Sequence, residues 1–238
     1  MRRQCLIDLY VHSSSGSVDE IVDVASNEGL DAVCFVVDSI DDLPEADVMS
    51  RASERGRASI FPGLSVDTGG TRWLILVPGW SAAPMEVFET LDDAQLLADA
   101  VAELGGVMIP ICPHQMPEHE TVPHLGPFPA EHAVGWVSMV VKGSQLGRHL
   151  DIEEASQAGL RTLGATGPFG RVDDMGRYAT LVPSDMTSLE GIAEALNRGL
   201  GVCVELRPAP EAKKPKKRGR RRRRPRRKRS KGSGETSS

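Results

Sequence analysis

Residues 4–37 have the sequence QCLIDLYVHSSSGSVDEIVDVASNEGLDAVCFVV, which predicts a strand, a helix and a second strand. The mostly apolar run at 4–11 is typical of a strand. Ser17 and Glu20 stand in the Ser-x-x-Glu arrangement of a helix capping box, and Gly29 is placed to end that helix. Residues 32–37 are apolar without interruption, which is typical of a strand buried on both faces.

The same alternation of strands and helices continues to residue 206. Helices are expected at 43–56, 92–104, 152–158 and 188–199, and strands at 59–66, 73–77, 107–112, 134–141, 161–165, 178–182 and 202–206. This order predicts an α/β fold with parallel strand pairing. About seven strand–helix units within roughly 208 residues favour a small barrel over an open sheet. Residues 113–133 hold five Pro and four His without periodicity, so we expect a long loop there.

Charge is divided unevenly along the 238 residues, whose formal net charge is −5. Of the 28 Lys/Arg and 33 Asp/Glu, residues 211–238 hold 15 and 2, a net charge of +13. The other residues therefore keep 13 basic and 31 acidic side chains, a net charge of −18. We predict two parts, a folded domain at 1–208 and a disordered Lys/Arg-rich tail at 209–238, because nothing apolar follows Ala212 that could enter a core.

The composition of the tail favours binding to the phosphate backbone of RNA or DNA. It contains no aromatic residue on which a base could stack, so its contacts should be electrostatic and nearly independent of sequence. An acidic protein partner, or the acidic part of this chain itself, is an alternative. A membrane partner is not expected, because no apolar anchor accompanies the charges. The predicted nucleic-acid-binding residues are Lys213, Lys214, Lys216, Lys217, Arg218, Arg220, Arg221, Arg222, Arg223, Arg224, Arg226, Arg227, Lys228, Arg229 and Lys231.

Cysteine usage and apolar run lengths indicate a cytoplasmic protein. Cys5, Cys34, Cys112 and Cys203 are far apart in sequence and lie in or beside apolar runs, so we expect buried thiols rather than disulfides. Asp8 interrupts the first apolar run, which argues against a signal peptide. No run reaches the roughly 20 apolar residues of a membrane span.

A series of short motifs resembles the PHP family, named after polymerase and histidinol phosphatase domains, over about residues 5–206. The motifs are DLYVHSS at 8–14 followed by Gly16-Ser17, GLDAV at 29–33, PGLS at 62–65, Gly105-Gly106-Val107 before Cys112-Pro113, Gly159-Leu160 with Gly164-Ala165-Thr166, and Leu181-Val182-Pro183 before a helix that ends at 195–199. The resemblance implies a distorted seven-stranded β/α barrel. It also implies two or three metal ions at the carboxyl-terminal mouth of the barrel and hydrolysis of phosphoesters.

Most metal ligands that the resemblance implies are replaced in this sequence. The implied ligand positions hold Tyr10, His12, Ser15, Val37-Asp38-Ser39, Ser65, Cys112, Thr166 and Pro168. Of these implied ligands His12 is retained, and Asp38 of a different motif is expected nearby. One imidazole cannot assemble a site for several metals. We therefore expect no catalytic residue, no bound metal and no cofactor, and we interpret His12 as vestigial, hydrogen-bonded to a neighbour such as Asp38 or Ser39.

Two further groups of residues could carry chemistry. Cys112, His114, His119 and His124 form Cys-x-His-x4-His-x4-His, which could be a relocated metal site or simply an exposed polar loop. Residues 167–170, with Arg171 and Arg177 beside them, could form a phosphate-binding turn or a tight connector.

The sequence thus predicts a non-catalytic PHP-like domain that binds nucleic acid through its basic tail, with the barrel as a scaffold or partner-binding module. The alternative is a divergent metal-dependent phosphoesterase, a PHP-type hydrolase, that acts on a nucleic-acid or nucleotide substrate. In that case a divalent metal would be its cofactor. The oligomeric state stays open.

Overall fold

The computed structural model describes residues 4–68, 71–79, 86–111, 133–142, 144–168, 170–183 and 188–207. Two predicted features lie outside these residues: the basic tail with its fifteen Lys and Arg, and the loop that contains Cys112, His114, His119 and His124. The predictions for the tail and for this loop therefore stay predictions.

The amino-terminal half forms the predicted parallel layer. It consists of β1 (Gln4–His12), α1 (Val18–Asn27), β2 (Ala32–Val37), α2 (Ala46–Arg55) and β3 (Ser59–Thr68). Strands β1, β2 and β3 are parallel neighbours. The side chain of Ser17 caps α1 by accepting a hydrogen bond from the backbone N–H of Glu20 at 3.3 Å, as the sequence predicts. Because β1, β2 and β3 are parallel, their carboxyl ends meet at one edge of the sheet.

Parallel pairing is wrong for the rest of the sheet, whose order is β5-β4-β3-β2-β1-β8-β9. Strands β4 (Thr71–Leu76) and β5 (Val107–Pro110) pair antiparallel, as do β8 (Tyr178–Pro183) with β1 and β9 (Val202–Glu205) with β8. The connection from β3 to β4 is too short to hold a crossover, which parallel strands require, so the chain reverses there. Helices α3 (Glu86–Thr90) and α4 (Ala94–Glu103) connect β4 to β5.

A second pair of strands, β6 (Trp136–Met139) and β7 (Thr162–Gly164), lies between the two ends of the curled sheet. Isolated β-bridges join this pair to the segment of β5, between Met108 and Ala133 and between Ile111 and Val137. Thr180 on β8 both accepts from the backbone N–H of Gly164 and donates to its carbonyl, at 3.1 and 2.9 Å. A side chain at Gly164 would place its Cβ 2.7 Å from a backbone oxygen of Ala179, so glycine permits this approach.

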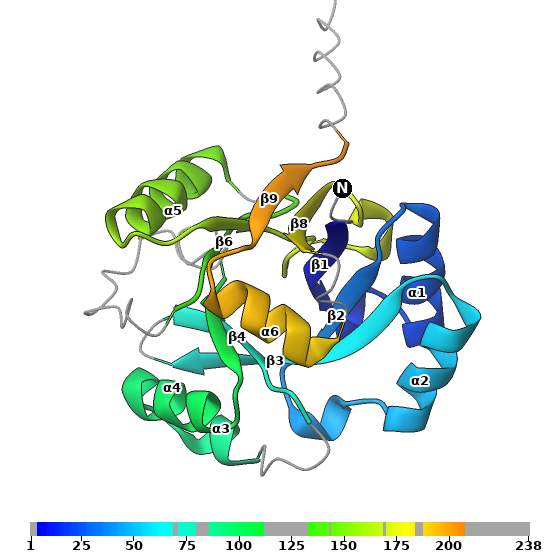
Figure 1. Cartoon of the computed structure of the whole chain (residues 1–238), viewed down its shortest axis with the longest axis horizontal. Helices are drawn as coiled ribbons and strands as arrows, with labels where there is room; N and C mark the ends of the chain where they lie inside the picture. Colours follow the sequence, from blue (N-terminus) through cyan, green and yellow to red (C-terminus); the bar gives the residue numbers. More distant parts are fainter. Residues whose placement is uncertain are drawn as a thin grey trace, which may run out of the picture. The chain divides into compact units, whose positions relative to one another are not determined.

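Apolar side chains fill both faces of the curled sheet. One cluster lies between the sheet and the helices α1, α2 and α4, and a second lies between the inner face of the sheet and α6 (Leu189–Asn197). Figure 1 shows α6 lying across the inside of the curl. Ile192 and Leu196 are buried in this inner cluster. The predicted α/β barrel-like fold is thus confirmed.

The largest error in element boundaries concerns α5 (Gln145–Gln157), for which the sequence predicts a helix only at 152–158. Leu146 and Ile152 on this helix are exposed, so its apolar residues do not mark one buried face. Ser144 caps it by accepting from the N–H of Gly147 at 2.9 Å. No helix within the described ranges is both long enough and apolar enough to cross a bilayer.

Candidate functional site

Side chains from the ends of three parallel strands and from the segment after β7 meet at the mouth of the barrel. The phenol of Tyr10 on β1 donates to the hydroxyl of Ser65 on β3 at 3.2 Å. The backbone N–H of Gly167 donates to the carbonyl of Tyr10 at 2.9 Å. Ser15 donates to the carbonyl of Gly170 at 3.2 Å. Positions that the PHP resemblance assigns to metal ligands are therefore brought together in space.

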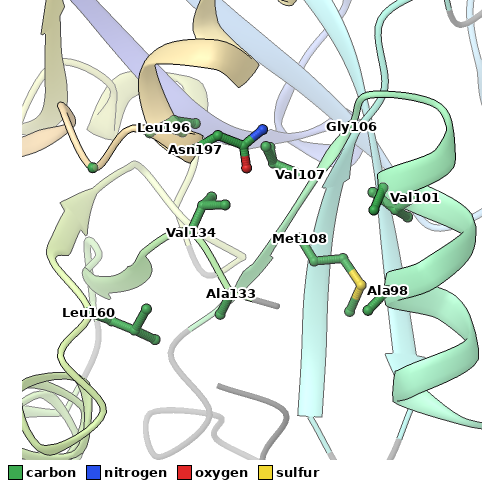
Figure 2. Close-up of a pocket in the computed structure, with 12 residues that line it drawn as sticks. Ala98, Val101, Gly106, Val107, Met108, Ala133, Val134, Leu160, Leu196 and Asn197 are labelled. Atoms are coloured by element: carbon green, nitrogen blue, oxygen red, sulfur yellow. The ribbon is translucent and has the colours of Figure 1, made fainter. Parts of the chain in front are cut away.

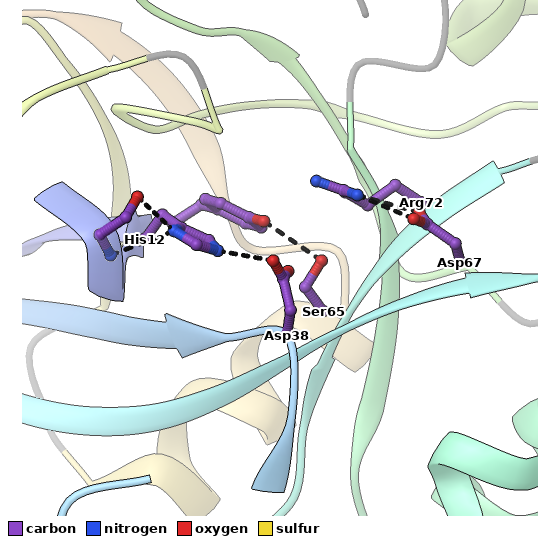
Figure 3. Close-up of polar contacts among 7 residues, drawn as sticks. His12, Asp38, Ser65, Asp67 and Arg72 are labelled. Atoms are coloured by element: carbon purple, nitrogen blue, oxygen red, sulfur yellow. Dashed lines mark hydrogen bonds and ion pairs between the residues drawn. The ribbon is translucent and has the colours of Figure 1, made fainter. Parts of the chain in front are cut away.

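His12 is held by hydrogen bonds at both ring nitrogens. Its Nε2 lies 3.0 Å from Oδ2 of Asp38, and its Nδ1 lies 2.7 Å from Oγ of Ser14 (Figure 3). The ring also stacks on that of Tyr10, with 6.4 Å between centroids and an interplanar angle of 18°. A partner at Asp38 is what the sequence predicts for an imidazole at this position. This arrangement orients His12 without any additional ligand.

A positive charge that the sequence analysis missed lies beside these residues. Arg72 on β4 donates two hydrogen bonds to Asp67 on β3, at 2.9 and 2.8 Å (Figure 3). These hydrogen bonds are the main cause that raises the pKa of Arg72, and Tyr10 and Asp38 act on it electrostatically in the same direction. Arg72 therefore belongs to the electrostatic environment of the mouth. The two strands around the turn after Thr68 pair Asp67 with Arg72 directly, and that hairpin register is the signal that could have revealed it.

A buried carboxyl group lies below the mouth. Asp8 on β1 is fully buried and accepts hydrogen bonds from the backbone N–H of Thr166 at 2.8 Å and from its hydroxyl at 2.5 Å. The N–H of Tyr10 adds a third, at 3.3 Å. Burial raises the pKa of Asp8 from 3.8 to about 7, although these hydrogen bonds act in the opposite direction. Asp8 thus ties β1 to the segment that follows β7.

The raised pKa of Asp8 predicts that the free energy of unfolding decreases as the pH rises from about 4 to about 7. Between these values the folded chain holds a proton that the unfolded chain has released, so each step upward in pH favours unfolding. In Asp8→Asn this contribution should disappear. The difference in the free energy of unfolding between about pH 4 and about pH 7 should then be smaller by at least about 1 kcal/mol. Urea unfolding at both ends of this range measures it, with the exposed Asp173→Asn as control. Equal pH dependence in the two variants would contradict the assignment.

The residues at the mouth do not fit a centre of two or three metal ions. Tyr10, Ser65 and Thr166 present neutral hydroxyls that are hydrogen-bonded within the protein, and Arg72 adds a cation next to them. Within the ranges that the structure describes, no three His, Cys, Asp or Glu side chains are grouped so that they could hold a metal ion. The His12–Asp38 pair alone supplies too few ligands.

Residues 167–170, for which the sequence allows a phosphate-binding turn or a tight connector, are better explained as a connector. The N–H of Gly167 is used by Tyr10, and that of Gly170 donates to the carbonyl of Gly167 at 3.2 Å. Gly167 has φ +78°, a conformation that suits glycine in a tight turn. The N–H of Arg171 donates to Asp174 at 2.9 Å. These donors are consequently not free to bind phosphate.

The described cysteines are unpaired thiols, as predicted. Cys5 and Cys34 are buried, and Cys203 is half-buried. Burial raises the pKa of Cys5 and of Cys203 to about 11, and burial raises that of Cys34 further. Such thiols are protonated at neutral pH and are poor nucleophiles or metal ligands.

An apolar pocket of about 410 Å³ lies at the amino end of β5, opposite the mouth (Figure 2). Val101 and Met108 line it together with Val134, Leu160 and Leu196. Asn197 is the one polar side chain among its described lining residues. A catalytic pocket needs several converging polar groups, which the described lining of this pocket does not supply.

Comparison with solved structures identifies the fold. A candidate metal-dependent phosphoesterase from Bifidobacterium adolescentis aligns with a TM-score of 0.54 and 13% identity, covering 81% of this chain and 96% of that one. A lesion-specific endonuclease from Pyrococcus furiosus aligns with a TM-score of 0.57 and 13% identity, covering 84% of this chain and 58% of that one. The barrel has a PHP-like fold. An amidohydrolase from Chromobacterium violaceum, solved with sulfate and no metal, aligns with a TM-score of 0.50 and 14% identity over 84% of this chain and 98% of that one.

The PHP resemblance of the sequence is thereby confirmed at the level of the fold. No family model matches the chain, and no curated protein sequence matches it. Identities of 13–14% are consistent with a strongly divergent sequence.

Proposed function

We propose that this chain is a nucleic-acid-binding protein in which the PHP-like barrel is non-catalytic and the tail at 209–238 contacts the phosphate backbone. One observation carries the proposal for the barrel. Described positions that the PHP resemblance assigns to metal ligands lie together, yet Tyr10 donates a hydrogen bond to Ser65 and Thr166 donates one to Asp8. Among the described residues, this hydrogen-bonded cluster contains no set of three ligands that could hold a metal ion to activate a water molecule.

The charge distribution supports assigning nucleic-acid binding to the tail. Residues outside 211–238 have a net charge of −18, which repels a polyanion, whereas the tail carries +13. Each Lys or Arg that neutralises a phosphate releases a counterion, and this release drives binding. In this proposal the barrel is a scaffold or binds another partner. The fold shared with a lesion-specific endonuclease supports a nucleic-acid context.

A direct test of the barrel is metal analysis combined with a phosphatase assay on the purified full chain. We expect far fewer than one tightly bound transition metal per chain, and no hydrolysis of phosphomonoesters above background when manganese, zinc or iron is supplied. The reason is the donor set at the mouth, which lacks the carboxylates and imidazoles that clustered metals need. Two or more retained metals per chain, with turnover that His12→Ala abolishes, would overturn the non-catalytic assignment.

The second candidate function is a divergent metal-dependent phosphoesterase that uses the tail to hold its substrate. The observation in its favour is the His12–Asp38 pair, 3.0 Å apart at the mouth, which retains two groups of the kinds that bind metals. The same assay separates two versions of this candidate. Turnover lost in His12→Ala would place the chemistry at the mouth, and turnover lost in His119→Ala or His124→Ala would place it at the loop.

A further inference from the structure

Two arginines meet at one tyrosine on the barrel, Tyr178 at the start of β8. Arg148 on α5 and Arg177, which precedes β8, place their guanidinium carbons 5.4 and 5.0 Å from the ring centroid of Tyr178. Both also donate to the phenol oxygen, at 3.4 and 3.3 Å. Arg148 donates in addition to the carbonyl of Val140 at 3.1 Å. These contacts fix two positive charges around one aromatic ring.

This pair, called the Arg148–Arg177 pair below, has no acidic partner in the part of the chain that the structure describes. Both side chains are half-buried, and the Nε atom of each is buried without a hydrogen-bond acceptor. Glu205 lies opposite Tyr178 in the register of β8 and β9 but forms no ion pair with either arginine there. Burying like charges together without a counter-charge is unfavourable, and a bound anion would offset that cost.

The pair also lies beside the last described residues of the barrel. The backbone N–H of Leu206 donates to the carbonyl of Arg177 at 2.8 Å, and Arg207 is the last described residue. Strand β8 runs antiparallel to β1, so its first residue, Tyr178, lies toward the carboxyl end of β1. The pair therefore lies close to the last described residues of the barrel, toward the carboxyl end of β1.

We propose that the Arg148–Arg177 pair binds a phosphate group of the nucleic-acid backbone, as a fixed contact on the barrel. The inference rests on the proposed function and adds a second phosphate-binding element to it. Guanidinium groups are well suited to this role because their planar donors match phosphate oxygens. Cation–π contacts with Tyr178 and the hydrogen bond to Val140 hold the donors in place before the ligand arrives, which lowers the entropic cost of binding.

The test compares full-length variants on one labelled single-stranded RNA and on one DNA duplex of the same length. In Arg148→Gln/Arg177→Gln we expect affinity to fall about 3- to 10-fold near 0.1 M salt, and the slope of log affinity against log salt to become shallower by about one phosphate contact. The matched control is Arg51→Gln/Arg198→Gln, which removes the same charge from two exposed arginines paired within helices. For this control variant, the slope of log affinity against log salt should equal that of the unmodified chain.

Further arms separate failure of this inference from failure of the proposed function. A full-length variant in which the fifteen Lys and Arg residues of the tail are changed to Gln should lose most of its affinity for RNA and DNA. Equal effects of the pair variant and of its control would overturn the pair as a site, while loss in the tail variant would still support the tail. Full binding by the tail variant would overturn the tail assignment. If the double variant unfolds by circular dichroism, Arg177→Gln alone is measured, and an unchanged slope in that folded variant overturns the inference.

Discussion

Deletion of residues 211–238 is expected to lower the affinity for RNA and DNA by at least about 100-fold near 0.1 M salt while the barrel stays folded. The deleted segment carries +13 and the remainder −18, so the deletion removes the attraction and leaves the repulsion. The two core clusters of the barrel are built from residues before 208, so no core contact among them is lost. Electrophoretic mobility shift at fixed salt measures binding, and urea unfolding measures stability.

The control for this deletion is a full-length chain in which a Gly/Ser segment of equal length replaces residues 211–238. It should bind as weakly as the deletion variant, because length without charge provides no phosphate contact. Full-strength binding by the deletion variant would show that the barrel surface recognises nucleic acid and would refute the assignment to the tail. A large loss of stability would show that the tail also contributes to the fold.

A second large effect is expected from salt. If about 6–10 phosphates are contacted, affinity of the full chain should fall by roughly 10³–10⁵ between 50 and 200 mM salt. A peptide of residues 209–238 should bind more tightly than the full chain at low salt, because the acidic residues of the barrel repel the ligand. This advantage should shrink as salt rises, since the Debye length is about 10 Å at 0.1 M.

The measurement is a salt titration of the peptide and of the full chain on the same oligonucleotide. Equal affinities of the peptide and the full chain at every salt concentration would show that the net charge of −18 does not weaken binding. Tighter binding by the full chain at every concentration would show that contacts on the barrel, such as the Arg148–Arg177 pair, outweigh the repulsion. A salt-independent affinity would rule out the phosphate backbone as the main ligand.

Short-range patterns in the sequence predict most of the individual elements. The capping box at Ser17 and the uninterrupted apolar run of β2 depend on neighbouring residues alone, and the structure contains both. The order of motifs predicts the PHP-like fold and the positions that meet at the mouth. A hydrogen-bond partner for His12 was also predictable, with Asp38 or Ser39 as the candidates, because a buried imidazole needs a partner; the structure pairs it with Asp38.

Tertiary structure decided the features that depend on residues far apart in the chain. Strand direction in β5, β8 and β9 follows from how the sheet curls and closes, which apolar periodicity does not encode. Asp8 and Thr166 are 158 positions apart, and Arg148 and Tyr178 are 30 apart, yet both pairs are in contact. Local sequence determines the helix caps, the apolar periodicity and the distribution of charge along this chain, because these depend on nearby residues. Folding alone determines which buried charge finds a partner, because burial and proximity arise only when distant segments pack together.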